Sequence, residues 1–313
     1  MKISIVIPVY NEEQSLILLY NEILEHTAQY SYEIIFIDDG STDKSFQILG
    51  AIAEKDANVK VIRFRRNFGK AAALNIGFRR STGDIVITMD ADLQDDASEI
   101  PNMITKLQEG WDIVTGWKKI RHDPITKTMP SKLFNAVASF VFKKKLHDYN
   151  CGFKAYRREV LHEIDVYGEM HRYIPALAFA KGFTVTEIPV NHRARQYGKS
   201  KYGSERYIRG YLDLLTVKLV TRFNRSPLYL FGGIGSVLFG SGFLLGLYLT
   251  IMRIFQSLYL SNRPLLFLSI LLIIVGLQFI SIGLIGELLV SQTRKFNKND
   301  SISIKEVINY DHS

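Results

Sequence analysis

Acidic residues follow two apolar runs in the first hundred residues of the chain. Asp38 and Asp39 end the run EIIFIDDG, and Asp90 and Asp92 end the run DIVITMDAD. Carboxylates that converge repel one another unless a cation lies between them, and hard cations such as Mg²⁺ or Mn²⁺ prefer oxygen ligands. A D-x-D pair alone is a weak signal, because many solvated turns contain one. Its position after an apolar run, with DDGSTD earlier in the chain, favours a metal-bound diphosphate.

These acids need a scaffold that brings the ends of separate segments together. Short β-branched runs at 3–10, 33–40, 59–64 and 84–90 alternate with helical patterns at 12–28, 44–57 and 70–80. This alternation predicts an α/β domain with a mostly parallel sheet and helices on both faces. Ligands of such sheets bind beyond the carboxyl ends of the strands. The polar residues expected at that edge are Tyr10, Asn11, Glu12, Asp38, Asp39, Asp90, Asp92 and Gln94.

Four segments in the first half of the chain resemble a known family. They are IPVYNEE (7–13), IDDGSTD (37–43), RNFGKAAALNIG (66–77) and MDADLQDD (89–96). Their order and spacing are similar to those of family 2 glycosyltransferases, which have the GT-A fold. Three later segments narrow the resemblance to the dolichol-phosphate mannose synthase family and its bacterial polyprenyl-phosphate relatives: GWKKIRHD (116–123), DYNCGFKAYRRE (148–159) and RQYGKSKYG (195–203).

The resemblance implies a nucleotide-sugar site whose residues carry over position by position. Those that match its nucleotide-sugar contacts are Pro8, Tyr10, Glu12, Ile37, Asp39, Asp90, Ala91, Asp92, Gln94, Lys118, Arg195 and Lys201. Of these, Asp90, Asp92 and Gln94 match the surroundings of the metal, so the implied cofactor is Mg²⁺ or Mn²⁺. Lys118 departs from the family pattern, because many relatives have arginine there and arginine binds phosphate through two parallel hydrogen bonds. The residues implied to be catalytic are Asp148, Asp92 and Arg121.

The implied reaction transfers a hexose to a polyprenyl phosphate, either undecaprenyl or dolichyl phosphate. A phosphate monoester has a second pKa of about 6 and is largely ionised at neutral pH. The acceptor therefore needs positioning more than deprotonation, and Arg121 and Lys118 are available for it. For Asp148, near the anomeric carbon, three roles stay open: orienting a sugar hydroxyl, stabilising positive charge, or acting as a base. Direct attack implies inversion of the anomeric configuration. UDP-glucose is the favoured donor and GDP-mannose the alternative.

Two apolar segments near the C-terminus, about 228–252 and 264–290, each exceed the roughly 20 residues that cross a bilayer. Basic residues flank the pair on its outer sides, which places both termini and the large domain in the cytoplasm. The expected domains are a cytoplasmic GT-A domain at 1–204, a juxtamembrane amphipathic helix at 205–226, two spans within 227–291 and a cytoplasmic tail at 292–313. The stripe of apolar residues at 125–146 predicts a second helix, lying on the membrane surface or against the core.

The remaining composition limits the partners. The net charge of +8 comes largely from basic residues beside the apolar segments, so anionic lipids are expected and nucleic acid is not. The single cysteine, Cys151, excludes an internal disulfide. Glycines in the first apolar segment allow close helix packing, and a homo-oligomer of undefined number is compatible with them. Two alternatives stay open: a processive polysaccharide synthase, although the chain lacks a Q-x-x-R-W element, and a non-catalytic membrane scaffold, although the carboxylates are present.

Overall fold

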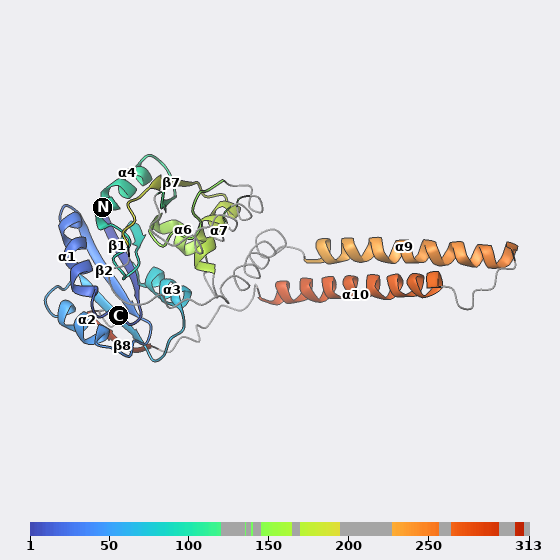
Figure 1. The fold of residues 1–313 in the computed structure, drawn as a ribbon, viewed down its shortest axis with the longest axis horizontal. Coiled ribbons are helices and arrows are strands. Elements are labelled where there is room, and N and C mark those ends of the chain that lie inside the picture. The colour runs from blue at the N-terminus through green and yellow to red at the C-terminus, as the bar shows by residue number, and fades with distance from the viewer. Residues whose placement is uncertain are drawn as a thin grey trace. The chain divides into compact units, whose positions relative to one another are not determined.

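The computed structural model describes residues 1–119, 135, 139, 145–164, 170–194, 227–256, 264–293 and 304–309. The chain forms two compact units (Figure 1). The first comprises Met1–Val217 together with Ser301–Ser313, and the second comprises Lys218–Asp300. The C-terminal segment therefore belongs to the same unit as the N-terminal domain.

The first unit is built on an eight-stranded mixed sheet with the order β7-β5-β6-β4-β1-β2-β3-β8. The strands are β1 Lys2–Val9, β2 Ser31–Asp38, β3 Val59–Phe64, β4 Ile85–Thr88, β5 Ile113–Trp117, β6 Lys154–Arg157, β7 Val185–Pro189 and β8 Ile304–Ile308. The first four strands run parallel, as do β5 and β7, whereas β6 and β8 are antiparallel to their neighbours. The carboxyl ends of β1, β2 and β4 consequently meet at one edge of the sheet.

Helices cover both faces of this sheet (Figure 1). One face is covered by α1 Leu16–Thr27, α2 Ser45–Ala53 and α4 Ile100–Gln108, which bury alternate side chains of β1 in the main core. The other face is covered by α3 Lys70–Arg80, which lies against Val6 and Ile37 through Gly77. Nearby lie α6 Arg158–Glu163 and the 3₁₀ turn η2 Met170–Tyr173, while η1 Ala97–Glu99 precedes α4 and α7 Ile174–Ala180 precedes β7.

The predicted elements of the first hundred residues are confirmed, with shifts at their ends. The strand at 59–64 and the helix at 70–80 agree to the residue. The helix predicted from residue 12 begins at Leu16, because the chain first turns through Asn11, whose φ is 52°. Of the predicted helix at 125–146, the structure describes only positions 135, 139, 145 and 146, of which Asn135 and Ser139 are helical. The amphipathic helix expected at 205–226 lies outside the described residues.

The expected tail at 292–313 contains a strand that the sequence analysis did not identify. β8 pairs antiparallel with β3, and Asn309 extends this contact by donating from Nδ2 to the carbonyls of Ala53 (2.7 Å) and Val59 (2.9 Å). Ile308 packs against the core cluster. With Lys305 and Glu306 among its five residues, β8 has the short and charged character of an edge strand.

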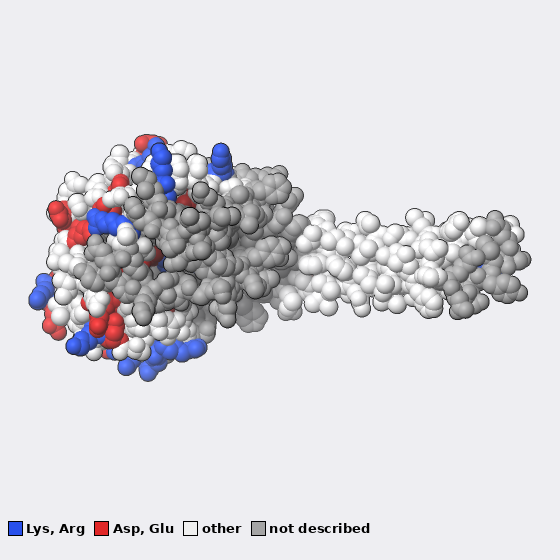
Figure 2. All heavy atoms as spheres, viewed as in Figure 1, with Lys and Arg blue, Asp and Glu red and all other residues white. Residues whose placement is uncertain are grey.

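The second unit contains α9 Pro227–Gln256 and α10 Pro264–Thr293, which pack against each other. Both are long and apolar enough to cross a membrane. Gly235 and Gly276 lie in the contact, where a Cβ on Gly235 would stand 2.6 Å from the Gly276 carbonyl oxygen. Large apolar side chains are exposed along both helices, and their described surface is almost free of charged groups (Figure 2). The small residues thus serve packing between these two helices, as expected.

Candidate active site

Asp39 follows β2 at the carboxyl edge of the sheet and is 4% exposed. Its carboxylate accepts hydrogen bonds from the backbone N–H groups of Phe68 (2.7 Å) and Gly69 (2.9 Å), which precede α3. Burial raises the pKa of Asp39 to about 6 despite these two bonds, and the charge of Asp38 adds to the rise. Asp39 therefore links the end of β2 to the start of α3.

Asp90 and Asp92 lie in the turn that follows β4. The Asp90 side chain is 34% exposed and forms an ion pair with the Nζ of Lys70, the first residue of α3. Burial alone would raise the pKa of Asp90, but Lys70, with Lys118 and His171 farther off, lowers it to about 2. Asp92 is 8% exposed and caps the backbone N–H of Gln94 at 3.2 Å. Between Asp92 and Gln94 lies Leu93, whose φ of 60° is a strained conformation of the kind found at functional sites.

Asp95 connects this turn to Lys118, a role that the sequence analysis did not predict. Its Oδ2 accepts from the backbone N–H of Asp90 (3.3 Å), and its Oδ1 lies 3.0 Å from the Nζ of Lys118. Burial would lower the pKa of Lys118, but the Asp95 carboxylate raises it above its ordinary value. Lys118 is thus held as a charged partner of Asp95. The available signal was the QDD that follows D-x-D in MDADLQDD.

Gly152, in the segment DYNCGF at 148–153, lies beside the Asp90 carboxylate. A Cβ on Gly152 would stand 2.8 Å from Oδ2 of Asp90, so only glycine leaves room for this approach. Thr88, at the end of β4, donates to the Gly152 carbonyl at 2.7 Å. Asp148 itself is 1% exposed, and its charge acts on the buried Lys154 amine of β6. The structure therefore brings the DYNCGF and MDAD motifs into direct contact.

The other predicted residues have different settings. Pro8, Tyr10, Glu12 and Gln94 are half-buried at the carboxyl edge, where the Glu12 N–H donates to Ser45 Oγ at 2.9 Å. Ile37 is fully buried, so its side chain packs in the core and only its backbone remains for a ligand. Ala91 is also a core residue, and its carbonyl accepts from Ser15 Oγ at 2.6 Å. Arg121, Arg195 and Lys201 lie outside the described residues.

A divalent cation at the carboxyl edge would take part of its coordination from a ligand. Among the residues that the structure describes, no group of three or more His, Cys, Asp or Glu side chains is placed to hold a metal. Asp90 and Asp92 supply two carboxylates, and Asp90 already faces a positive charge on Lys70. Mg²⁺ commonly binds through one or two carboxylates and completes its shell with phosphate oxygens and water. Such an ion would neutralise a diphosphate held at this edge.

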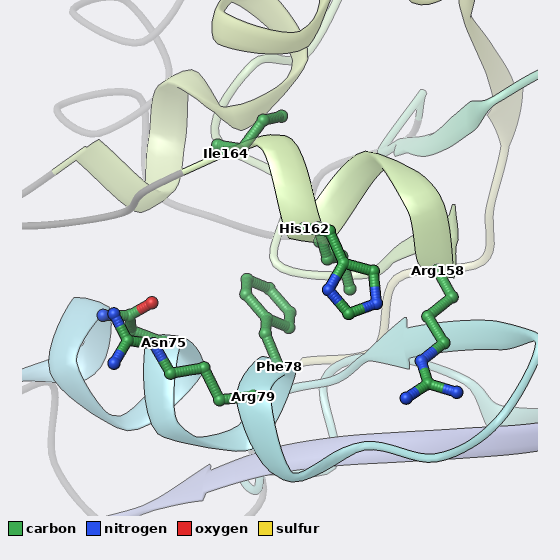
Figure 3. Close-up of a pocket in the computed structure, with 7 residues that line it drawn as sticks. Asn75, Phe78, Arg79, Arg158, His162 and Ile164 are labelled. Atoms are coloured by element: carbon green, nitrogen blue, oxygen red, sulfur yellow. The ribbon is translucent and has the colours of Figure 1, made fainter. Parts of the chain in front are cut away.

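A separate cavity of about 210 Å³ lies between α3 and α6 (Figure 3). It is lined by Asn75, Phe78, Arg79, Arg158, Leu161, His162 and Ile164. The Arg158 N–H donates to the carbonyl of Asp84, just before β4, so the cavity lies at the amino edge of the sheet. The guanidinium groups of Arg79 and Arg158 point away from each other in Figure 3. None of the predicted site residues lines this cavity.

The fold and the carboxyl edge together define a GT-A type glycosyltransferase, in which a D-x-D turn after a parallel strand contacts Gly152 of the DYNCGF segment. The chain belongs to glycosyl transferase family 2, whose family model matches residues 4–165. This confirms the family and the fold that the sequence motifs predicted.

Relatives extend the likeness beyond the family domain. The chain is 37% identical over 290 residues to an undecaprenyl-phosphate 4-deoxy-4-formamido-L-arabinose transferase of Photorhabdus laumondii, covering 91% of this chain and 88% of the relative. It is 32% identical over 308 residues to a dodecaprenyl-phosphate galacturonate synthase of Rhizobium johnstonii, covering 96% of this chain and 90% of the relative. A solved structure with the same fold is glucosyl-3-phosphoglycerate synthase of Mycobacterium tuberculosis with Mn²⁺ and uridine diphosphate. The two structures have a TM-score of 0.55 and 18% sequence identity, and the match covers 70% of this chain and 78% of the other.

Proposed function

We propose that the protein transfers a sugar from a nucleotide-sugar to a polyprenyl phosphate at a membrane surface. The observation that carries the proposal is the contact of the Asp90 carboxylate with Gly152, which joins the D-x-D turn to the segment that begins at Asp148. The names of the two relatives support a polyprenyl-phosphate acceptor. The two long apolar helices support a membrane location.

In this proposal Asp90 and Asp92 hold Mg²⁺ or Mn²⁺, which when bound stabilises the negative charge of the departing nucleotide diphosphate. Asp39 binds the nucleotide through its ribose or base, from the end of β2, which is separated from β4 by β1. Lys70 forms an ion pair with Asp90, so its amine lies next to the carboxylate that is proposed to bind the metal. Arg195 and Lys201 remain proposed phosphate contacts from the family resemblance.

The acceptor phosphate is already ionised at neutral pH, so the protein's task is to position it. Arg121 is the proposed contact for this phosphate, while Lys118 contributes through Asp95. Asp148 then orients a sugar hydroxyl or stabilises the positive charge that develops at the anomeric carbon. Direct attack by the phosphate inverts the configuration, so an α-linked donor gives a β-linked lipid phosphate.

The strand β8 supports the orientation proposed for the chain. β8 and β3 share one sheet, which supports a topology with the segments before α9 and after α10 on the same side of the membrane. An even number of spans satisfies this condition, and the basic flanks favour the cytoplasmic side. Both termini and the catalytic domain are therefore proposed to be cytoplasmic. A cysteine introduced at Ser313 should be labelled by an impermeant maleimide only after spheroplasts are opened, and labelling of intact spheroplasts would contradict this topology.

The test of the function is a donor panel. Full-length protein in undecaprenyl-phosphate-containing nanodiscs is incubated with labelled UDP-glucose, GDP-mannose, UDP-galacturonate and UDP-4-deoxy-4-formamido-L-arabinose, each with Mg²⁺, with Mn²⁺ or with excess chelator. UDP-glucose is the first donor to test. The expected product is one lipid-linked sugar that requires the metal and whose anomeric proton reports inversion by NMR. Failure of every donor to label the lipid would overturn the proposal.

A further inference from the structure

Asp148 lies in a backbone that is held on both sides by side chains from other segments. The residue before it is His147 and the residue after it is Tyr149, and both are hydrogen-bonded to the same side chain, that of Asn135. Asp148 adds a local bond, since its Oδ1 accepts from the Asn150 N–H at 3.1 Å. The backbone on both sides of Asp148 is therefore fixed by a side chain from another segment, and the carboxylate also accepts a local bond.

Asn135 makes two complementary contacts and is only 6% exposed. Its Nδ2 donates to the His147 carbonyl at 2.8 Å, and its Oδ1 accepts from the Tyr149 N–H at 3.2 Å. A carbonyl only accepts and an N–H only donates, so these partners fix the orientation of the amide. Neither a carboxylate nor an aliphatic side chain can satisfy both. Ser139, four residues later on the same helical face, donates to the Leu146 carbonyl at 3.3 Å.

A second hold comes from the strands. Glu187 on β7 accepts from the His147 N–H at 2.8 Å through Oε2, while its Oε1 contacts the His147 ring nitrogen Nδ1. The His147 ring stacks on Trp117 at the end of β5, with centroids 4.2 Å apart. Because β5 and β7 pair directly, the contacts of Glu187 and Trp117 with His147 come from neighbouring strands of the sheet. The chain at residue 147 is thus fixed from the sheet side and from the Asn135 side.

We propose that Asn135 is a positioning residue for Asp148, fixing the backbone on both sides so that the carboxylate is presented to the sugar. This inference rests on the proposed function, in which Asp148 acts at the anomeric centre. Asn135 belongs to the segment predicted to form a helix on the membrane surface or against the core.

The test is a double-mutant cycle in the full-length protein. Asn135→Ala is expected to lower kcat about 10- to 100-fold, because a misplacement of about 1 Å can cost that much, and to change the KM for the nucleotide-sugar less than about twofold. In an Asp148→Asn background the same substitution should change kcat less than about twofold, because residues that act as a unit are not additive. Asn102→Ala is the matched control, since Asn102 is exposed on α4 and its amide donates to Glu99 of η1 at 2.8 Å.

Hydrogen exchange gives a readout that does not depend on catalysis. Loss of the Asn135 acceptor should speed exchange of the Tyr149 amide in Asn135→Ala, and not in Asn102→Ala. Additive losses in the cycle, or a raised donor KM with unchanged kcat, would overturn the positioning role while leaving the transferase function intact. If the wild type transfers no sugar, the proposed function fails, and unchanged exchange at Tyr149 would separately reject the role of Asn135.

Discussion

The two edges of the sheet both bury carboxylates, but they compensate them differently. Glu33 and Asp39 lie at opposite ends of β2. Glu33, at the amino edge, accepts from Ser4 Oγ (2.5 Å) and from both the N–H (2.6 Å) and Oγ1 (2.9 Å) of Thr82, and pairs with Lys60 (2.7 Å). Burial would raise its pKa, but these donors lower it to about 2. At the carboxyl edge, two backbone N–H bonds leave the pKa of Asp39 raised to about 6.

The difference separates structural from functional acids. Glu33 has a cationic partner and enough donors to satisfy its oxygens, so its charge stabilises the fold and is closed to other ligands. Asp39 is buried next to Asp38 and faces the loop before α3. A ligand hydroxyl there would donate a further hydrogen bond to its carboxylate. The same contrast makes the carboxyl edge the place where added positive charge or hydrogen-bond donors are most favourable.

The largest expected effect is at the carboxyl edge. Asp90→Asn should lower sugar transfer about 10²- to 10³-fold, the cost of removing one electrostatic contact to the transition state. Its thermal midpoint should shift by less than that of Glu33→Gln, because the Asp90 side chain is 34% exposed. Initial rates with saturating Mg²⁺ and thermal unfolding of the same preparation measure both. Full transfer activity in this variant would remove the distinction between the two edges.

Glu33→Gln should lower the stability of the fold and leave sugar transfer nearly unchanged. Breaking a buried ion pair by removing one partner costs about 3 kcal/mol, whereas the activity per folded molecule should stay within about twofold of the wild type. The folded pKa of Glu33 is depressed, so its stabilisation is present above pH 4.5 and is lost as the pH falls through about 2. Glu109→Gln is the control, because its ion pair with Lys106 is exposed and contributes less than about 1 kcal/mol. Equal midpoint shifts in the two variants would contradict the argument.

Gly152→Ala is expected to lower transfer about 10- to 50-fold, since a displaced catalytic group can cost this much. The added methyl would stand 2.8 Å from the Asp90 carboxylate, which must move away from its place in the site. Gly50→Ala is the matched control, because on α2 the nearest atom to an added Cβ is the Ile308 Cδ1 at 3.8 Å. Kinetics of both variants at saturating donor give the comparison. Unchanged activity of Gly152→Ala would show that the two motifs do not need their close contact.

The sequence predicted the strands that end in acids, because continuous β-branched runs and D-x-D spacing are local features. It did not predict Asp95 as the partner of Lys118, since the two residues are 23 positions apart and meet only when β5 lies two strands from β4. The strand β8 was missed for a similar reason. A five-residue edge strand with two charged side chains carries almost no periodic signal, and its place is set by β3. Asn135 and Glu187 were invisible because each contacts backbone, which sequence patterns do not record.

The smallest expected effect is a pH dependence of donor binding. Because the pKa of Asp39 is raised to about 6, the fraction ionised falls about fourfold between pH 7.5 and 5.5, and the Kd for nucleotide-sugar should rise by about that factor. Calorimetry without the acceptor isolates this effect from titration of the lipid phosphate. Asp39→Asn should bind more weakly and show little dependence on pH in this range, and a wild-type Kd independent of pH would contradict the assignment. The sign for stability is opposite to that of Glu33: ionisation of Asp39 opposes folding above pH 6, and this opposition disappears as the pH falls toward 3.8.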